Sequence, residues 1–324
     1  MFKKSFSTLN FYSRRFLSIN QPSAINWAKQ EKIIMEPFEY LHKLDAKYHA
    51  LMAPCFDHWL QVPKQKYDAI QEAMHTCMTW TMLLDDIQDD SNYRYGLPSA
   101  HRVFGVGLTI NAANKAMLLS QKQVADLGHP SAVEKFWNVH EQFFYAAGVD
   151  FYWKEKNIFP SEQAHIEMTT KKSGSWFALP VELMQLFSTN KTDYTNLALD
   201  VGTYYALVDD YYNLFMPNAL QTLTTAVKRE NYAPANDITE SKMTMAIIHA
   251  SQFPDVGPEL ADILKQRTSD LNLINRALTL IKKHGSDEYA RNVLKKVDAE
   301  IRAEIDRLGG NPKLEAYMDG LGIY

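Results

Sequence analysis

Two clusters of acidic side chains are the residues of this sequence with the clearest potential for chemistry. Each cluster follows an apolar run and holds side-chain oxygens four residues apart: Asp85, Asp86 and Asp89 in the first, and Asp209, Asp210 and Asn213 in the second. Residues four apart share one face of a helix, where like charges repel and need a positive partner. Carboxylate oxygens suit Mg²⁺, which keeps water ligands and shares its coordination shell with substrate phosphates.

Two such acidic faces could hold one diphosphate group through several metal ions and absorb the charge that develops when the diphosphate leaves. A solvated acidic helix end is the plainer interpretation of either cluster taken alone. The apolar residues before the first cluster, and the repeated spacing in the second, favour a shared metal site that faces a pocket.

Helices must position these clusters, and the sequence predicts helices almost throughout. Apolar residues recur at three- and four-residue steps, and the expected helices cover residues 64–90, 108–127, 132–153, 176–187, 195–214, 240–252 and about 257–306. Residues 95–98 predict a turn, residues 215–236 predict a long loop, and no alternating pattern predicts a strand of useful length. The sequence therefore predicts an all-α fold in one large helical domain.

The overall composition excludes several functional classes. The chain has 324 residues, of which 46% are hydrophobic, and a net charge of -4, so there is no bulk electrostatic case for nucleic-acid binding. Two cysteines cannot make a zinc cluster or a disulfide framework. No apolar run reaches the roughly 18 residues that a membrane span needs.

The first thirty residues differ from the rest of the chain. They contain no Asp or Glu and mix basic residues with serines and scattered apolar residues. This composition is typical of a mitochondrial presequence, and an untethered N-terminus is the plainer alternative. We expect an extension over residues 1–30 and a catalytic domain over residues 31–324. We also expect a soluble intracellular protein, mitochondrial if the presequence interpretation holds and otherwise cytoplasmic.

The order of the motifs resembles the isoprenyl diphosphate synthase family, and geranylgeranyl diphosphate synthases within it. The resemblance runs from about residue 37 to residue 312 and includes residues 94–101, 172–175, 184–188, 237–242 and 309–312. It implies the isoprenoid synthase fold, a single large helical bundle around a deep central cavity that usually forms a homodimer. It also implies a prenyl diphosphate substrate and three Mg²⁺ ions, with Mn²⁺ as a substitute.

The resemblance assigns roles to individual residues. The two acidic clusters would be catalytic and would hold the metal ions directly or through neighbouring groups. Arg94, Lys172 and Lys242 match positions that contact the diphosphate of the allylic substrate. Lys47 matches a basic group that holds the second substrate, isopentenyl diphosphate.

The second-substrate positions depart most from the family pattern. Ala50 stands where the family has arginine, Met78 where it has histidine, and Tyr95 where it has a second arginine. Charge-assisted hydrogen bonds contribute about 1.5–3 kcal/mol each, so three losses weaken the site by roughly 4 kcal/mol or more. That corresponds to a loss of affinity on the order of 10³-fold.

The resemblance also indicates pocket residues. Ala147 and Ala206 replace two glutamines of the family pattern, and Trp80 lies five residues before Asp85, where relatives use side-chain size to set cavity depth. Aromatic side chains would stabilise carbocations through their faces. The expected pocket set is Trp80, Phe144, Ala147, Trp176, Tyr205 and Ala206, with core packing as the plainer interpretation of each aromatic residue.

These features lead to one hypothesis with two alternatives. The leading hypothesis is a Mg²⁺-dependent class I terpene synthase that turns one prenyl diphosphate, preferably geranylgeranyl diphosphate and then farnesyl diphosphate, into a terpene hydrocarbon. Insects are known to use diverged members of this family to make volatile terpenes, often pheromones. The alternatives are a prenyltransferase that condenses isopentenyl diphosphate with an allylic diphosphate, and a non-catalytic regulatory subunit, which the two complete acidic clusters disfavour.

Restoring the family residues at the three changed second-substrate positions should strengthen the binding of isopentenyl diphosphate. The combined variant Ala50→Arg, Met78→His and Tyr95→Arg should bind isopentenyl diphosphate at least about tenfold more tightly than the wild type, because multidentate cationic contacts hold such ligands. Titration calorimetry of both proteins measures this difference. Micromolar binding by the wild type itself would show that the second-substrate site was never lost.

Overall fold

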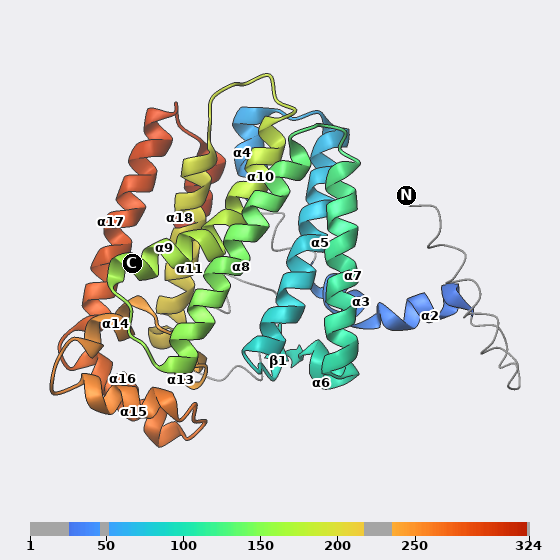
Figure 1. The fold of residues 1–324 in the computed structure, drawn as a ribbon. Helices are drawn as coiled ribbons and strands as arrows, with labels where there is room; N and C mark the ends of the chain where they lie inside the picture. Colours follow the sequence, from blue (N-terminus) through green and yellow to red (C-terminus); the bar gives the residue numbers. More distant parts are fainter. Residues whose placement is uncertain (1–25, 46–51, 217–234, 323–324) are drawn as a thin grey trace, which may run out of the picture.

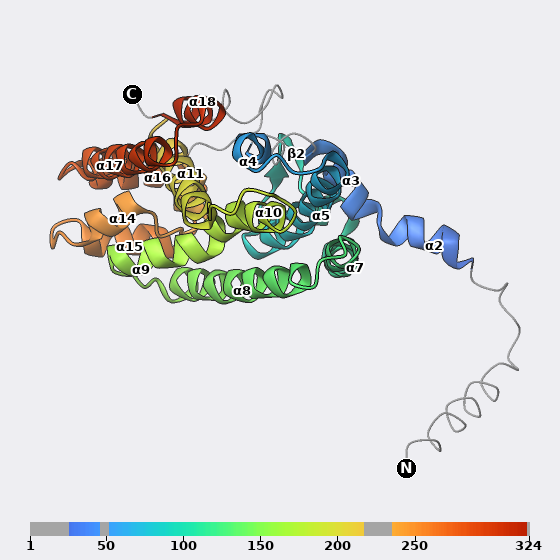
Figure 2. The same ribbon diagram turned by 90° about the horizontal axis from the view of Figure 1, so that it is seen from above.

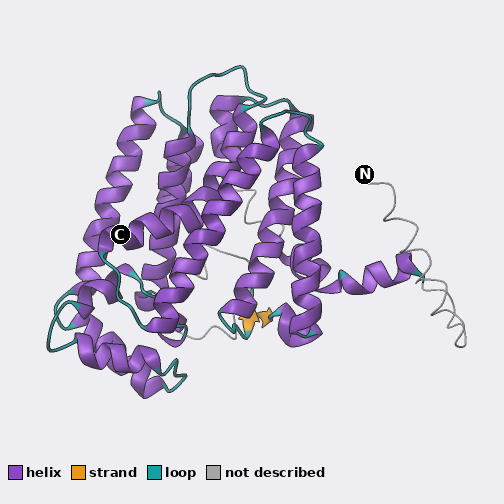
Figure 3. Ribbon diagram, viewed as in Figure 1, coloured by secondary structure: helices purple, strands orange, loops and turns teal. Residues whose placement is uncertain are grey.

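The computed structural model describes residues 26–45, 52–216 and 235–322, and these residues are almost entirely helical (Figure 1 and Figure 3). The all-α prediction is therefore confirmed. The proposed N-terminal extension up to residue 25, the positions Lys47 and Ala50, and most of the expected loop 215–236 lie outside the described residues.

The helices follow one another along the chain, and most of the connections that the structure describes are short. They are α2 Trp27–Ile34, α3 Glu36–Asp45, α4 Ala53–Leu60, α5 Lys64–Gln88, α6 Ala100–Phe104, α7 Val106–Ala125, α8 Ala132–Lys156, α9 Glu162–Thr169, α10 Ser175–Gln185, α11 Thr195–Phe215, α13 Asn236–Thr239, α14 Met245–Ser251, α15 Gly257–Lys265, α16 Leu271–Lys282, α17 Ser286–Arg307 and α18 Pro312–Leu321, with a π-helical turn, η1, over Thr170–Gly174 between α9 and α10.

The long helices stand side by side. Figure 1 shows α5, α7, α8, α10 and α11 as neighbouring upright rods, and the view from above in Figure 2 places α10 and α11 inside a ring made by the others. Helix α5 packs along α7 and α3, α10 packs along α11, and α11 packs along α17. The central helices are therefore covered on most sides, which explains the long apolar runs in their sequences.

Helix α5 carries the first acidic cluster to a defined place. Its 25 residues contain no Gly or Pro, and the backbone N–H of Val62, just before Pro63, donates to the side chain of Asp57 at 2.8 Å. The helix ends where the N–H of Asp89 bonds to the carbonyl of Asp85 at 2.9 Å and Asp90 adopts a left-handed φ of 54°. Asp85 and Asp86 therefore occupy the last turn of α5, and Asp89 is the C-cap residue directly after it.

A two-stranded ribbon follows α5, where the sequence predicted only a turn. Strand β1, Tyr93–Arg94, pairs antiparallel with β2, Leu97–Pro98. Tyr95 and Gly96 between them have φ values of 53° and 79°, the backbone of a tight hairpin turn in which both central residues are left-handed. The hairpin turns the chain back on itself and brings Arg94 to the end of α5.

Glycine allows a close approach at the centre of the bundle. A Cβ atom on Gly202 of α11 would lie 2.7 Å from the ring of Phe177 on α10, and one on Gly174 would lie 2.8 Å from the carbonyl oxygen of Leu199. Both distances are shorter than atoms tolerate, so only glycine fits at these positions. The π turn η1, in which the N–H of Ser175 bonds to the carbonyl of Thr170, is held tightly against α11.

The region after residue 235 differs from the single helix predicted over residues 240–252. The short helix α13 ends at Thr239, Ser241 adopts a left-handed φ of 57°, and α14 begins at Met245. The N–H of Lys242 bonds to the carbonyl of Asp237 at 2.8 Å. Glu240 and Lys242 consequently lie on a tight turn rather than on a helix.

None of the helices within the described ranges combines the length and the apolar character needed to cross a bilayer.

Trp80 of α5 is fully buried in a hydrophobic cluster that α5 forms with neighbouring helices. Its ring packs on His140 and Phe144 of α8 and on Trp176 of α10, and its indole N–H donates to Ser120 of α7 at 3.3 Å. This position corrects the expectation that Trp80 lines the pocket. Trp80 is five residues, or about 140° of helical rotation, away from Asp85, so the two side chains leave α5 in different directions.

The burial of Trp80 predicts a large loss of stability on truncation. Trp80→Ala should lower the free energy of unfolding by about 3–5 kcal/mol, because it leaves a cavity among three aromatic rings and removes the hydrogen bond from the indole to Ser120. Urea-induced unfolding followed by circular dichroism measures this change. A loss below about 1 kcal/mol would contradict the core assignment.

Candidate active site

One cavity of about 630 Å³ runs along α5. Its described walls come from α4, α5, the hairpin, α8, η1, α10, α11, α13 with the turn after it, and α18. One part of the wall is acidic and basic, with Asp85, Asp89, Asp209, Asp237, Glu240, Arg94, Lys154, Lys172 and Lys242. Another part is mostly apolar, with Met52, Met74, Met78, Met82, Trp176, Phe177, Pro180 and Leu321. The size is that of a site for a small organic molecule.

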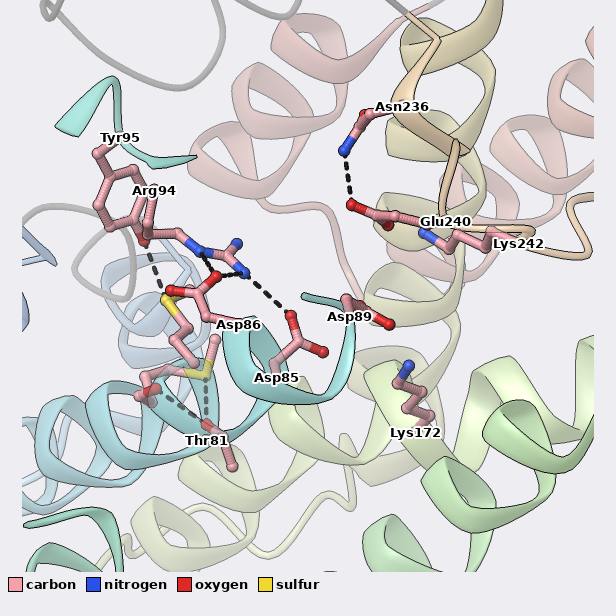
Figure 4. Close-up of polar contacts among 12 residues, drawn as sticks. Thr81, Asp85, Asp86, Asp89, Arg94, Tyr95, Lys172, Asn236, Glu240 and Lys242 are labelled. Atoms are coloured by element: carbon pink, nitrogen blue, oxygen red, sulfur yellow. Dashed lines mark hydrogen bonds and ion pairs between the residues drawn. The ribbon is translucent and has the colours of Figure 1, made fainter. Parts of the chain in front are cut away.

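Asp85 and Asp86 at the end of α5 are held by Arg94 from the hairpin (Figure 4). The Arg94 Nε donates to Asp86 Oδ1 at 2.8 Å, and one terminal nitrogen reaches Asp85 Oδ2 at 3.0 Å. The side chain of Asp86 is 1% exposed, whereas that of Asp85 is 38% exposed. Asp86 is therefore the internal anchor for Arg94, and Asp85 presents its second oxygen to the cavity.

The electrostatic surroundings shift the pKa values of these two neighbouring carboxyls in opposite directions. Burial opposes ionisation of Asp85, but the positive charges of Arg94 and Lys172 outweigh it and hold its pKa below the usual range. Burial dominates at Asp86 and raises its pKa to about 6. Asp85 is thus ionised at neutral pH and suited to bind a cation.

Asp210 and Asn213 of α11 are held by α13 and the turn after it. Lys242 Nζ lies 2.6 Å from Asp210 Oδ1 and 3.9 Å from Asp237 Oδ1. The Asn213 side chain accepts the backbone N–H of Asp237 at 3.1 Å and donates to Asn236. Asn236 in turn donates to Glu240 at 2.8 Å. This network fixes Asn213 and places Glu240 opposite the end of α5 (Figure 4).

A second network joins α8 to the end of α5. Lys154 Nζ lies 2.9 Å from Asp89 Oδ1 and 3.6 Å from Asp150 Oδ2. Lys172 Nζ from η1 lies 2.6 Å from the same oxygen of Asp150. Both lysines line the cavity.

The site holds more acid than base. Eight carboxyls, of Asp85, Asp86, Asp89, Asp150, Asp209, Asp210, Asp237 and Glu240, surround the four cations Arg94, Lys154, Lys172 and Lys242. Burial, with repulsion from Asp89, raises the pKa of Glu240 to about 7, and burial and nearby acids place the pKa of Asp237 well above its usual range. Raised carboxyl pKa values show that additional positive charge would be accommodated here.

The oxygen ligands in the cavity suit Mg²⁺, which can share its coordination with water and substrate, better than a metal ion that is held entirely by protein side chains. Within the described ranges, no three His, Cys, Asp or Glu side chains converge closely enough to hold an ion by themselves. Mg²⁺ commonly binds one or two carboxylates and completes its octahedron with water and substrate phosphates. Asp85 and Asp89 on one side, and Asp209 and Asn213 on the other, would hold such ions together with a diphosphate.

Most of the predicted site residues come together in this cavity. Asp85, Asp89, Asp209, Asn213, Arg94, Lys172, Lys242, Trp176 and Tyr205 line it. Asp86 and Asp210 lie behind the wall and anchor Arg94 and Lys242. Phe144, Ala147 and Ala206 are not among the lining residues, and the Phe144 side chain is 45% exposed.

Sequence reasoning missed Lys154 and Glu240 as members of the site. Lys154 stands four residues after Asp150, so the two share a helix face, and this spacing was a usable signal. Glu240 belongs to the 237–242 motif, but its position depends on the turn at Ser241, which helical periodicity does not predict.

The comparisons with known proteins agree with this geometry. The family described as polyprenyl synthetase matches residues 31–281. The chain belongs to the polyprenyl synthetase family and is therefore an enzyme that acts on prenyl diphosphates. Members of this family typically use Mg²⁺.

Relatives with two different activities resemble the chain over most of its length. A terpene synthase of Matsumurasca onukii is 37% identical over 289 residues, which cover 89% of this chain and 92% of that protein. Geranylgeranyl pyrophosphate synthases of Mucor circinelloides f. lusitanicus and Dictyostelium discoideum are each 34% identical, and each match covers 90% of this chain and 94% of the relative.

Because Asp85 is exposed to the cavity and Asp86 is buried, substitution of Asp85 should reduce activity and substitution of Asp86 should reduce stability. Asp85→Ala should abolish turnover of prenyl diphosphate with little change in melting temperature, because Asp86 still holds Arg94. Asp86→Ala should lower the free energy of unfolding by about 3–5 kcal/mol, because it leaves the Arg94 guanidinium without its buried partner. Melting curves and diphosphate release assays of both variants distinguish the two effects; equal melting temperatures would refute the anchoring role of Asp86.

The raised pKa of Glu240 predicts a pH effect on stability. Between its ordinary value of 4.5 and about 7, the folded protein keeps a proton that the unfolded chain releases, so this contribution to stability is present at low pH and is lost as pH rises through about 7. Glu240→Gln should therefore show a smaller fall in melting temperature between pH 5 and pH 8 in EDTA. Parallel falls in variant and wild type would exclude Glu240 as a titrating group in this range.

Proposed function

We propose that this enzyme is a Mg²⁺-dependent class I terpene synthase that ionises one prenyl diphosphate and needs no second substrate. The observation that carries the proposal is the uncharged surface at the two described positions, 78 and 95, that the resemblance assigns to the second substrate. Met78 and Tyr95 both line the cavity, and the Tyr95 hydroxyl contacts the sulfur of Met82 at 3.1 Å. The basic residues of the described wall, Arg94, Lys154, Lys172 and Lys242, are all paired with acids of the metal side.

Helix α5 supplies a continuous apolar wall beside the acidic residues. At 100° per residue, Met74, Met78 and Met82 fall on the same side of the helix as Asp85, and all four line the cavity. Met78 stands about 10 Å along the helix from Asp85. Methionine is flexible and polarisable and adapts to irregular hydrocarbon shapes. A prenyl tail would therefore bind favourably against this wall. A second diphosphate placed there would lose its hydration and find no cationic partner.

The length of this wall supports a C20 substrate. Gln71, near the N-terminal end of α5, also lines the cavity, and the fourteen residues from Asp85 to Gln71 span about 21 Å. An extended geranylgeranyl chain, with bonds of about 1.5 Å in a zigzag, is about 19 Å long. Farnesyl diphosphate is the next candidate.

The residues of the site would divide the reaction between them. Bound Mg²⁺ would take up the charge of the departing diphosphate when the C1–O bond breaks. Lys172, Lys242 and Arg94 would shift from their aspartates toward the diphosphate oxygens. Trp176, Phe177 and Tyr205 present aromatic surface to the cavity, which would stabilise the allylic cation and exclude water until the cation loses a proton.

The similarity to the terpene synthase of Matsumurasca onukii supports the proposed terpene synthase activity, whereas the similarity to geranylgeranyl pyrophosphate synthases supports a prenyltransferase. A prenyltransferase would need Lys47 and further groups outside the described residues to hold isopentenyl diphosphate. The absence of positive charge on Met78 and Tyr95 makes that alternative the weaker one.

A single assay separates the two activities. The purified enzyme with Mg²⁺ is incubated with C10, C15 or C20 allylic diphosphate, with and without isopentenyl diphosphate, and the headspace and organic extract are analysed. We expect a terpene hydrocarbon from the C20 substrate, in equal yield with and without isopentenyl diphosphate. Longer prenyl diphosphates, formed only when isopentenyl diphosphate is present, would establish the prenyltransferase instead.

A further inference from the structure

Lys154 is a buried cation at the edge of the site that no predicted role accounts for. Its side chain is 3% exposed, and it lines the cavity from α8. Burial opposes its charge, but Asp150 and Asp89 outweigh burial and raise its pKa above the usual value. A permanently charged, desolvated lysine is costly unless its partners are well placed.

The partners of Lys154 connect two parts of the site. One is Asp89, at 2.9 Å, a candidate metal ligand of α5, and the other is Asp150, at 3.6 Å, one turn earlier on α8. Asp150 Oδ2 also holds Lys172, at 2.6 Å. Acid and base therefore alternate through Asp89, Lys154, Asp150 and Lys172, and Lys154 and Lys172 share one carboxylate oxygen.

We propose that Lys154 is a positioning residue that couples Asp89 to Lys172. Without ligand, Lys154 neutralises Asp89, and Asp150 holds Lys172 away from the substrate. Once Asp89 is engaged by Mg²⁺, Lys154 has Asp150 as its remaining partner and competes with Lys172 for it. Lys172 is then released toward the diphosphate. This role rests on the proposed metal–diphosphate site, but it does not depend on which prenyl product forms.

A double-mutant cycle tests the coupling, with inorganic diphosphate as the probe and saturating Mg²⁺ in titration calorimetry. Lys154→Met and Lys172→Met should each weaken binding by about tenfold, the scale of one charge-assisted contact. If Lys154 acts through Lys172, the double variant should be no weaker than the single variants. Independent contributions would multiply to about a hundredfold loss and would overturn the proposal.

Three further variants make the test specific. Lys154→Arg should restore most of the affinity, because it returns a cation between Asp89 and Asp150. Lys156→Met is the matched control, since Lys156 is an exposed lysine on the same helix, and it should bind as the wild type does. Failure of either expectation would contradict the positioning role.

Asp150→Asn keeps the proposal testable if Lys154→Met does not fold. This change weakens the acceptor that holds Lys172, so binding of magnesium diphosphate should equal or exceed that of the wild type. Weaker binding would indicate that the network is only structural. A wild type that binds no magnesium diphosphate would refute both the proposed function and the coupling, whereas normal wild-type binding with a hundredfold loss in the double variant would refute the coupling alone.

Discussion

The concentration of carboxyls between the ends of α5 and α11 is the constraint on which the rest of the site depends. Like charges at this spacing repel, and burial adds a cost to each charged group. The fold meets that cost with four cations brought from the hairpin, α8, η1 and the turn after α13. Since acids still outnumber bases, the ligand-free site favours the arrival of divalent ions with a diphosphate.

The supporting elements can be understood from this requirement. The tight hairpin after α5 returns Arg94 to Asp86, and the π turn at η1 lies against α11 because Gly174 has no side chain. Changes of helical geometry of this kind are common at functional sites. Three of the cations that neutralise the acids in the absence of ligand, Arg94, Lys172 and Lys242, are the groups that would contact the diphosphate, so binding would exchange their partners instead of creating new charges.

Sequence reasoning could predict the helices and the two acidic clusters because both follow from local spacing. Asp85 and Asp89 had to share a face, and the apolar residues before them had to be buried. Which face of α5 meets the cavity is a tertiary property, and here the prediction for Trp80 was wrong. Its ring packs toward α7 and α8, whereas Met78 and Met82 face the cavity. The turn that places Glu240 and Lys242, and the buried contacts of Lys154, also depend on packing between distant segments.

The apolar wall of α5 explains how a member of this family would act on one substrate. The metal side retains its carboxylates and cations, while the described second-substrate positions present methionine and tyrosine to the cavity. Relatives with 33–37% identity include both synthases and a terpene synthase, so overall similarity does not decide between the activities. The side chains at positions 78 and 95 bear on that choice more directly than the identity of the whole chain.

The number of diphosphate ligands that one chain binds is the most direct measurement of this difference. The enzyme would be saturated with Mg²⁺, a non-ionising thio analogue of geranylgeranyl diphosphate and isopentenyl diphosphate, and the bound ligands counted by equilibrium dialysis. One prenyl analogue per chain, with no bound isopentenyl diphosphate, is the expected result. One molecule of each ligand per chain would contradict a single-substrate site.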